Sequence, residues 1–182
     1  MLLIAGLGNP GIKYKKTRHN IGMIILDSFI DSFAKSKKFT AEIAQEKIME
    51  QEVIFVKPET FMNASGESIK KISAFYKIEP QNILVIHDDL DLLPGTMKFS
   101  FQKSSAGHKG VESTIQNLGT DAFNRLRIGI GKPLPPTPSE SFVIANFSKE
   151  EQKIIKENLP LYKEAILNFI QNGINSAMNK YN

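Results

Sequence analysis

Residues 1–22 read MLLIAGLGNPGIKYKKTRHNIG, and the class of fold is already visible in how this stretch begins. The apolar run Leu2–Leu7 predicts a short buried strand bounded by glycine. The turn Gly6–Gly11 follows, then an aromatic and basic cluster, and then His19 and Asn20. A strand that ends in a glycine turn beside polar side chains is typical of the ligand-binding edge of an α/β sheet.

The composition limits the chain to a few classes of protein. A length of 182 residues with 41% hydrophobic residues suits one buried core, so we expect a single domain over residues 1–182. The absence of cysteine excludes disulfides and a thiolate nucleophile. A net charge of +4 permits an anionic partner, but nucleic-acid binding has to come from local basic clusters. With no leader segment and no apolar run of membrane-spanning length, we expect a cytoplasmic protein without membrane contact.

Strand-like and helix-like segments alternate along the chain. The predicted strands are Leu2–Leu7, Glu52–Lys57, Ile83–His87, Thr96–Phe101, Leu126–Ile130 and Ser141–Ala145. The predicted helices are Ile21–Phe33 running into the basic residues Lys35–Lys38, Ala64–Tyr76 with Ile69, Ile72 and Phe75 inward, Val111–Leu118, and the C-terminal region with a break at Pro160. This alternation predicts an α/β fold in which helices flank a twisted, mixed and largely parallel central sheet.

The glycine turn allows two interpretations. Gly6, Gly8 and Gly11 match the G-x-G-x-x-G pattern of dinucleotide-binding loops. That pattern needs a helix at the third glycine to hold the pyrophosphate, and Gly11–Arg18 has no helical apolar period. The pattern also needs an acidic residue at the end of a second strand, about 20 residues further along. The acidic residues at that distance lie instead in a segment with helical spacing. We therefore expect a tight turn that binds no dinucleotide.

Polar side chains follow three of the predicted strands. Asn9 follows the first strand, Asn63 follows the strand that ends near Lys57, and Asp88 follows Ile83–His87. His19 lies close in sequence to the first of them. The carboxyl ends of parallel strands form the ligand crevice of such sheets, so these groups are expected to converge. A histidine and aspartate pair can activate a water molecule, and asparagine amides can bind a carbonyl or a developing oxyanion.

Other residues of the same types could fill these roles. The alternatives to the histidine and the aspartate are His87, His108, Asp89 and Asp91. The two asparagines could instead be turn or helix-cap residues. Because the chain has no cysteine and no close-packed histidine and carboxylate motif, we expect neither a metal nor another cofactor, and an activity that survives chelators.

Five ordered blocks of sequence carry these residues. They are GLGNPGIKYKKTRHNIG (6–22), KPETFMNASG (57–66), ILVIHDDLDLLPG (83–95), SSAGHKG (104–110) and FNRLRIGIG (123–131). Together they resemble the bacterial peptidyl-tRNA hydrolase family from Leu3 to about Gly131, whereas the C-terminal third is similar mainly in its helical character. Enzymes of this family cleave the ester that joins a peptide to the 3′ ribose of tRNA, and thereby recycle tRNA from prematurely released chains.

The resemblance implies a role for each matching residue. His19 resembles the general base that activates the attacking water, and Asp88 resembles its orienting partner. Asn9 resembles the residue that binds the peptide backbone and rejects unblocked aminoacyl-tRNA. The positions that resemble substrate contacts are Tyr14, Phe61, Met62 and Asn63. Arg127 resembles one half of a clamp on the 5′-phosphate of the tRNA.

Two positions depart from the family pattern. The loop that usually ends in GGHNG has Lys109 in place of the asparagine, so an amide that contacts substrate and helps to place water is replaced by an ammonium group. The strand that usually reads K-x-K has Lys98 followed by Ser100, which removes the second cation of the clamp. Lys103 or Lys109 could supply the missing charge.

The sequence thus predicts a metal-independent and cofactor-free esterase that acts on peptidyl-tRNA as a monomer. Candidate contacts to the acceptor stem are Lys13, Lys15, Lys16, Arg18, Lys98, Lys103, Lys109, Arg125 and Arg127. Two other hypotheses stay open. The chain could be a nucleotide-binding module that uses the glycine turn, or an RNA-binding protein without enzymatic activity in which His19 has no catalytic role.

Overall fold

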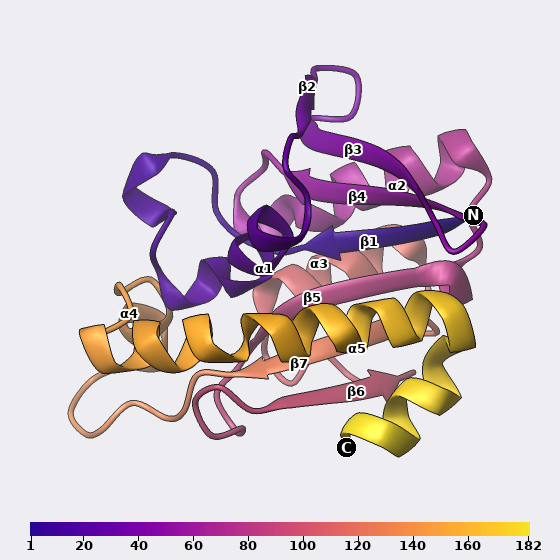
Figure 1. Ribbon diagram of the computed structural model, residues 1–182. Coiled ribbons are helices and arrows are strands. Elements are labelled where there is room, and N and C mark those ends of the chain that lie inside the picture. The colour runs from indigo at the N-terminus through magenta and orange to yellow at the C-terminus, as the bar shows by residue number, and fades with distance from the viewer.

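A seven-stranded sheet with the order β2-β3-β4-β1-β5-β7-β6 runs through the computed structural model, which describes residues 1–182 (Figure 1). Its strands are β1 (Leu2–Gly6), β2 (Ala34–Ser36), β3 (Ala41–Ile48), β4 (Gln51–Pro58), β5 (Ile83–Asp89), β6 (Met97–Phe101) and β7 (Asn124–Gly129). The four central strands β4, β1, β5 and β7 are parallel, whereas β3 and β2 on one side and β6 on the other pair antiparallel with their neighbours.

Helices cover both faces of this sheet. They are α1 (Ile21–Phe29), α2 (Ser65–Tyr76), α3 (Lys109–Leu118), α4 (Ser139–Val143) and α5 (Lys149–Tyr181). In Figure 1, α1 and α5 lie in front of the sheet, and α2 and α3 lie behind it. The chain therefore forms the mixed α/β fold, with a parallel centre, that the sequence predicts.

Each face of the sheet has its own hydrophobic core, because successive side chains of a strand point to opposite faces. Ile4 and Ile86 join the core beneath α1 and α5. Leu3 and Val85 join the core beneath α2 and α3. Strands that are buried on both faces need an unbroken apolar run, which is why LLIA and ILVI are so easily recognised in the sequence.

Two segments between α1 and β4 differ from the prediction. The predicted helix from Ile21 to Phe33 is too long, since Ile30 is already extended (φ −120°, ψ 126°), and the first of the basic residues, Lys35, lies in β2. The strand β3 was not predicted. Its sequence AEIAQEKI alternates weakly, and four of its eight positions are exposed or half-exposed polar residues of an outer strand pair. Such a strand is held by its ladder to β4 rather than by a hydrophobic run.

Three details of the later segments are also corrected. Ser141–Ala145 is not a strand, because Pro138 starts the short helix α4 and accepts a hydrogen bond from the Phe142 N–H at 3.0 Å. Phe75 does not point inward and is 55% exposed. Pro160 does not break the C-terminal helix: it is exposed, while Ile155 and Tyr162 on either side remain buried in one core. The non-helical residue within α5 is Gly173 (φ 76°, ψ −176°).

The glycine turn lacks the geometry of a dinucleotide loop. Gly11 has φ 99° and is followed by a 3₁₀ turn, Ile12–Tyr14, and α1 begins only at Ile21. No helix N-terminus is therefore available at the third glycine to hold a pyrophosphate.

None of the helices combines the length and the hydropathy that a membrane-spanning helix needs.

Candidate active site

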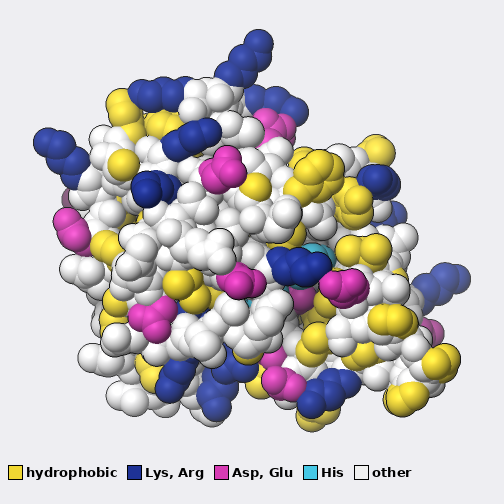
Figure 2. Space-filling view, turned by 180° about the vertical axis from the view of Figure 1, so that it is seen from behind, with side chains coloured by type: hydrophobic (Ala, Val, Ile, Leu, Met, Phe, Trp, Pro, Cys, Tyr) yellow, Lys and Arg dark blue, Asp and Glu magenta, His cyan; other side chains and the backbone are white.

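An open cleft of about 1210 Å³ lies at the carboxyl ends of the central strands, where the polar residues were expected to converge. It is lined by nine of the predicted site residues: Asn9, His19, Phe61, Met62, Asn63, Asp88, Lys103, Lys109 and Arg127. Two predicted residues, Tyr14 and Lys98, are not part of its lining. On the face shown in Figure 2, histidine comes to the surface among acidic and basic side chains.

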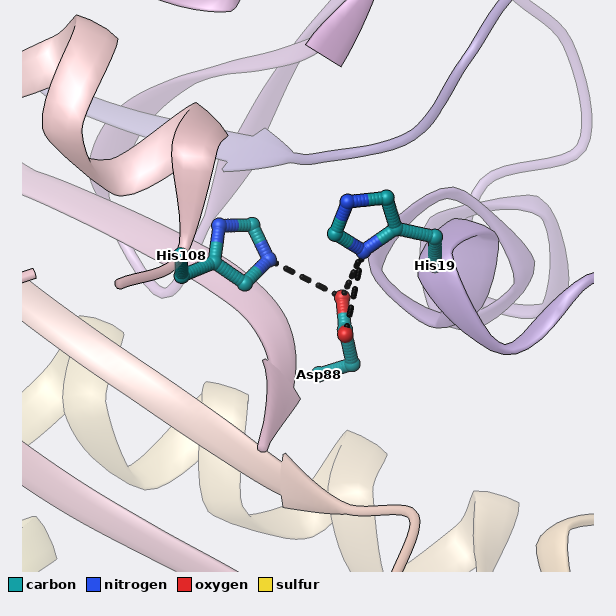
Figure 3. Close-up of side chains that lie close together, drawn as sticks. All are labelled: His19, Asp88 and His108. Carbon is teal, nitrogen blue, oxygen red and sulfur yellow. Dashed lines mark hydrogen bonds and ion pairs between the residues drawn. The ribbon is translucent and has the colours of Figure 1, made fainter. Parts of the chain in front are cut away.

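Asp88 lies at the centre of the site, between two histidines (Figure 3). Its Oδ1 and Oδ2 atoms lie 2.8 and 3.0 Å from Nδ1 of His19, and Oδ1 also lies 3.0 Å from Nε2 of His108. The alternatives from the sequence are bonded elsewhere, since Asp89 pairs with Arg127 and Asp91 pairs with Lys132. The structure therefore brings together the predicted histidine and aspartate.

The environment keeps Asp88 ionised. Burial alone would raise the pKa of its carboxyl group. The two histidines outweigh this effect, His108 more than His19, and hold the pKa of Asp88 well below its usual range. A permanent negative charge is thus held next to His19, where it favours any positive charge that develops on the ring.

His108 is a site residue that the sequence offered only as an alternative to His19. Its Nδ1 accepts hydrogen bonds from the backbone N–H groups of Gly110 and Val111, both at 3.2 Å, so it also caps the N-terminus of α3. The expectation of no close-packed histidine and carboxylate motif is wrong, because the ligand atoms of His19, Asp88 and His108 lie within 4.8 Å of one another. Residues 19, 88 and 108 are too far apart in the sequence to form a recognisable motif. Metal independence itself stays a prediction.

Two features hold His19 at the strand ends. Gly22, three residues later, allows α1 to touch the sheet, since a Cβ atom there would lie 2.3 Å from the Ile86 carbonyl oxygen and 2.5 Å from the Leu7 nitrogen. Arg18, the preceding residue, is buried and binds Glu151 with Nε and Nη2, at 3.2 and 2.6 Å. A side chain larger than that of glycine at position 22 would clash with the backbone of the sheet and displace the start of α1.

Asn9 presents its amide to the cleft in one orientation. Its Oδ1 accepts a hydrogen bond from the Met62 N–H at 2.8 Å, which leaves its Nδ2 free to donate to a ligand. The backbone of Asn9 is bonded twice to the side chain of Asn20, at 2.9 Å each. Asn20 was not predicted as a site residue, and its position next to His19 was the only signal in the sequence.

Basic side chains line one side of the cleft. Nε of Arg127 donates to Asp89 at 2.6 Å, and Lys98 lies directly across the strand pair from Arg127. Nζ of Lys109 pairs with Glu140 of α4 at 2.8 Å, and both side chains are largely exposed. Lys109 therefore already has an anionic partner across the mouth of the cleft, which the sequence did not predict.

Two of the candidate tRNA contacts are corrected. Arg18 is 8% exposed, and its Nη1 donates to three backbone carbonyls, one in α4 and two between α4 and α5, in addition to the pair with Glu151. Arg125 is 3% exposed and donates to the carbonyl oxygens of Lys103 and Ser104. Both guanidinium groups hold loops in place, and Arg18 does not line the cleft, whereas Arg125 forms part of its buried wall.

The buried ring of His87 is expected to make the fold less stable in mild acid. Burial first, and then His108, lowers the pKa of its ring well below the usual range, so the folded chain keeps His87 neutral. In the unfolded chain a histidine titrates near pH 6.5, so below that pH only the unfolded chain takes up this proton. The free energy of unfolding that His87 contributes above about pH 6.5 is therefore lost as the pH falls. We expect the free energy of unfolding to fall by up to about 1.4 kcal/mol per pH unit between pH 6.5 and 5. Urea unfolding of the wild type and of His87→Gln checks this, and an equal slope in both would contradict it.

The comparisons with known proteins agree with this geometry. A family model described as peptidyl-tRNA hydrolase matches residues 3–182. The chain belongs to the peptidyl-tRNA hydrolase family. Relatives named peptidyl-tRNA hydrolase include one from Desulfitobacterium hafniense, 42% identical over 184 residues and covering 100% of both chains. Another, from Clostridium botulinum, is 40% identical over 185 residues and covers 100% of this chain and 96% of the relative. A crystal structure of peptidyl-tRNA hydrolase from Acinetobacter baumannii matches with a TM-score of 0.94 at 32% identity, over 100% of this chain and 94% of that one.

Membership of the peptidyl-tRNA hydrolase family confirms the resemblance seen in the sequence blocks. It also extends that resemblance, because the matched region continues beyond Gly131 through α4 and α5. The C-terminal helix therefore belongs to the shared fold.

Proposed function

We propose that this member of the peptidyl-tRNA hydrolase family hydrolyses the ester between a peptide and the 3′ ribose of tRNA, with His19 as the general base. The observation that carries the proposal is the pair of contacts, at 2.8 and 3.0 Å, between Nδ1 of His19 and the buried carboxylate of Asp88. The protein is a hydrolase that acts on an ester bond, and residues 1–182 act as one domain, as a monomer, in the cytoplasm.

The contact with Asp88 fixes which ring nitrogen of His19 reacts. Nδ1–H donates to the carboxylate, so Nε2 carries the lone pair that accepts a proton from water. The water oxygen attacks the ester carbonyl, and the carboxylate of Asp88 stabilises the imidazolium ion. As the bond between the carbonyl carbon and the ribose oxygen breaks, Nε2–H returns the proton to the leaving oxygen. The products are a peptide acid and a tRNA with a free 3′ end.

Amide groups bind the peptide part of the substrate in this proposal. The free Nδ2 of Asn9 donates to a peptide carbonyl, and Asn63 offers a second amide at the same cleft. Phe61 and Met62 line the apolar wall beside them. Tyr14, at the end of the 3₁₀ turn outside the cleft lining, is the remaining proposed contact.

Asn9→Ala is expected to weaken discrimination more than folding. In the wild type, an unblocked aminoacyl-tRNA has an ammonium group near Asn9 in place of the peptide group that would accept from its amide. The Nδ2 of Asn9 is then left without a hydrogen-bond partner, which disfavours binding of this substrate. The ratio of hydrolysis rates for blocked and unblocked aminoacyl-tRNA should fall by about 10-fold. Parallel assays with the two substrates measure the ratio, and a ratio equal to that of the wild type would remove Asn9 from this role.

The tRNA phosphates bind to the basic side of the cleft. The proposed contacts are Arg127, Lys98 and Lys103. Lys109 is the proposed replacement for the second cation of the clamp, because position 100 holds a serine. Lys109 pairs with Glu140 at 2.8 Å, so binding of a phosphate exchanges one exposed ion pair for another. Such an exchange is inexpensive, because exposed pairs contribute about 0–1 kcal/mol.

Lys109→Ala is expected to raise KM for full-length peptidyl-tRNA and to reduce its salt dependence. Each lost phosphate contact lowers the slope of log affinity against log salt by roughly one unit or slightly less. A short ester substrate without the acceptor stem should be hydrolysed at nearly the wild-type rate. Lys103→Ala is the matched control and should show a smaller effect. Equal loss of turnover on both substrates would mean that Lys109 acts in the chemistry and not on the phosphate.

Release of peptide from peptidyl-tRNA by the wild type and by His19→Ala tests the proposal. Binding of tRNA with equal affinity in the presence and absence of the ester, and no release, would support an RNA-binding protein. Binding of dinucleotides without release would support a nucleotide-binding module.

A further inference from the structure

The geometry points to His108 as a positioning residue: the N-terminus of α3 fixes the tautomer of its ring, and the resulting Nε2–H holds the carboxylate of Asp88 against His19 (Figure 3). The inference rests on the proposed function, since it assigns a role beside the same catalytic pair. Nothing in the sequence indicates this role, because His108 and Asp88 lie 20 positions apart in the chain.

The tautomer follows from the hydrogen bonds at Nδ1. The N–H groups of Gly110 and Val111 both point at this atom from 3.2 Å, so it has to offer a lone pair and carries no proton. These N–H groups belong to the first turn of α3, where the helix dipole also disfavours a cation. The one proton of the neutral ring is therefore on Nε2, which faces Oδ1 of Asp88 at 3.0 Å.

The consequence is a carboxylate that is held from two sides. Oδ1 of Asp88 accepts from Nε2–H of His108 and from Nδ1–H of His19, so the plane of the carboxylate cannot turn away from His19. The same tautomer leaves Nε2 of His108 without a lone pair. The cluster of His19, Asp88 and His108 therefore works as a set of hydrogen bonds, and a metal ion would first have to displace a proton.

The arrangement also sets the strength of the base. A donor on Oδ1 spreads the negative charge of Asp88 and so weakens its pull on the proton of His19. Loss of the His108 donor should then favour the imidazolium form of His19 and move the acid limb of the pH–rate profile to higher pH. The other titratable group in contact with the His108 ring is His87, whose ring centroid is 4.7 Å away, and the next residue, Lys109, is paired with Glu140.

Two substitutions separate the cap from the contact with Asp88. His108→Asn places an amide oxygen where Nδ1 was, so it caps α3 but is too short to reach Asp88. His108→Gln places an N–H where Nε2 was, so it reaches Asp88 but caps poorly. Ser148→Ala is the control, because Ser148 caps α5 far from the cleft through a hydrogen bond from the Glu151 N–H.

We expect His108→Asn to keep the wild-type Tm, to lower kcat/KM about 10-fold, and to shift the acid limb upward by about half a pH unit or more. His108→Gln should lower Tm, as Ser148→Ala does, yet restore most of the rate and the wild-type limb. A wild-type rate and limb in His108→Asn, or a downward shift, would overturn the inference. An NMR titration of the His19 ring in His108→Asn reports the same shift without turnover, so it still tests the inference if the wild type releases no peptide and the proposed function fails.

Discussion

His19→Ala is expected to fold and to bind tRNA like the wild type, yet to release peptide roughly 10²–10⁴ times more slowly, the range that general-base catalysis contributes. The ring lines the cleft and belongs to neither hydrophobic core, so its removal leaves the packing intact. Asp88 keeps its second partner, His108, and is not left as an unpaired buried charge. The slow step is then attack by water that no base has activated.

Single-turnover release of peptide from a labelled peptidyl-tRNA measures this loss without interference from product release. The melting temperature and the affinity for deacylated tRNA show whether the variant is otherwise intact. A rate within a factor of about three of the wild type would mean that His19 does not act as the base. In that case His87 is a poor replacement, since its Nε2 is buried without a partner and cannot contact a substrate.

The central part of the fold could be predicted because its signals are local. The runs Leu2–Ala5, Val53–Val56 and Ile83–Ile86 are apolar at every position, as parallel strands between two helical layers require. The segments that were missed depend on distant partners. β3 forms on the edge of β4, and α4 forms where Phe142 packs on the guanidinium group of Arg18 at 4.1 Å. No sequence pattern within either segment predicts these contacts.

The same difference applies to the site. Asn9, Asn63 and Asp88 could be placed because residues that follow parallel strands share one edge of the sheet. The role of Asn20 and the second partner of Asp88 depend on where loops come together, which spacing does not show. Arg18 illustrates the limit best. As one of four basic residues in KYKKTR it suggests a nucleic-acid contact, but its ion pair with Glu151, 133 positions later, holds it buried beside His19.

Asp88→Asn is expected to slow peptide release by about 10- to 100-fold, which is less than the loss of His19. The substitution isolates charge from geometry, because the amide oxygen of asparagine can still accept from both rings at the position of Oδ1. What it cannot do is stabilise an imidazolium ion. His19 therefore becomes a weaker base, and the acid limb of the pH–rate profile should move to lower pH.

The direction of this shift distinguishes the two partners of Asp88. Removing the charge with Asp88→Asn moves the acid limb downward, whereas removing the competing donor with His108→Asn moves it upward, so the two variants should lie on opposite sides of the wild type. The pKa of Asp88 lies well below its usual range in the folded chain, so its contribution to stability is present above about pH 4 and is lost as the pH falls further. Urea unfolding below pH 4 should accordingly show a weaker pH dependence in Asp88→Asn than in the wild type. An unchanged acid limb together with a normal rate would show that the carboxylate is not the partner of the base.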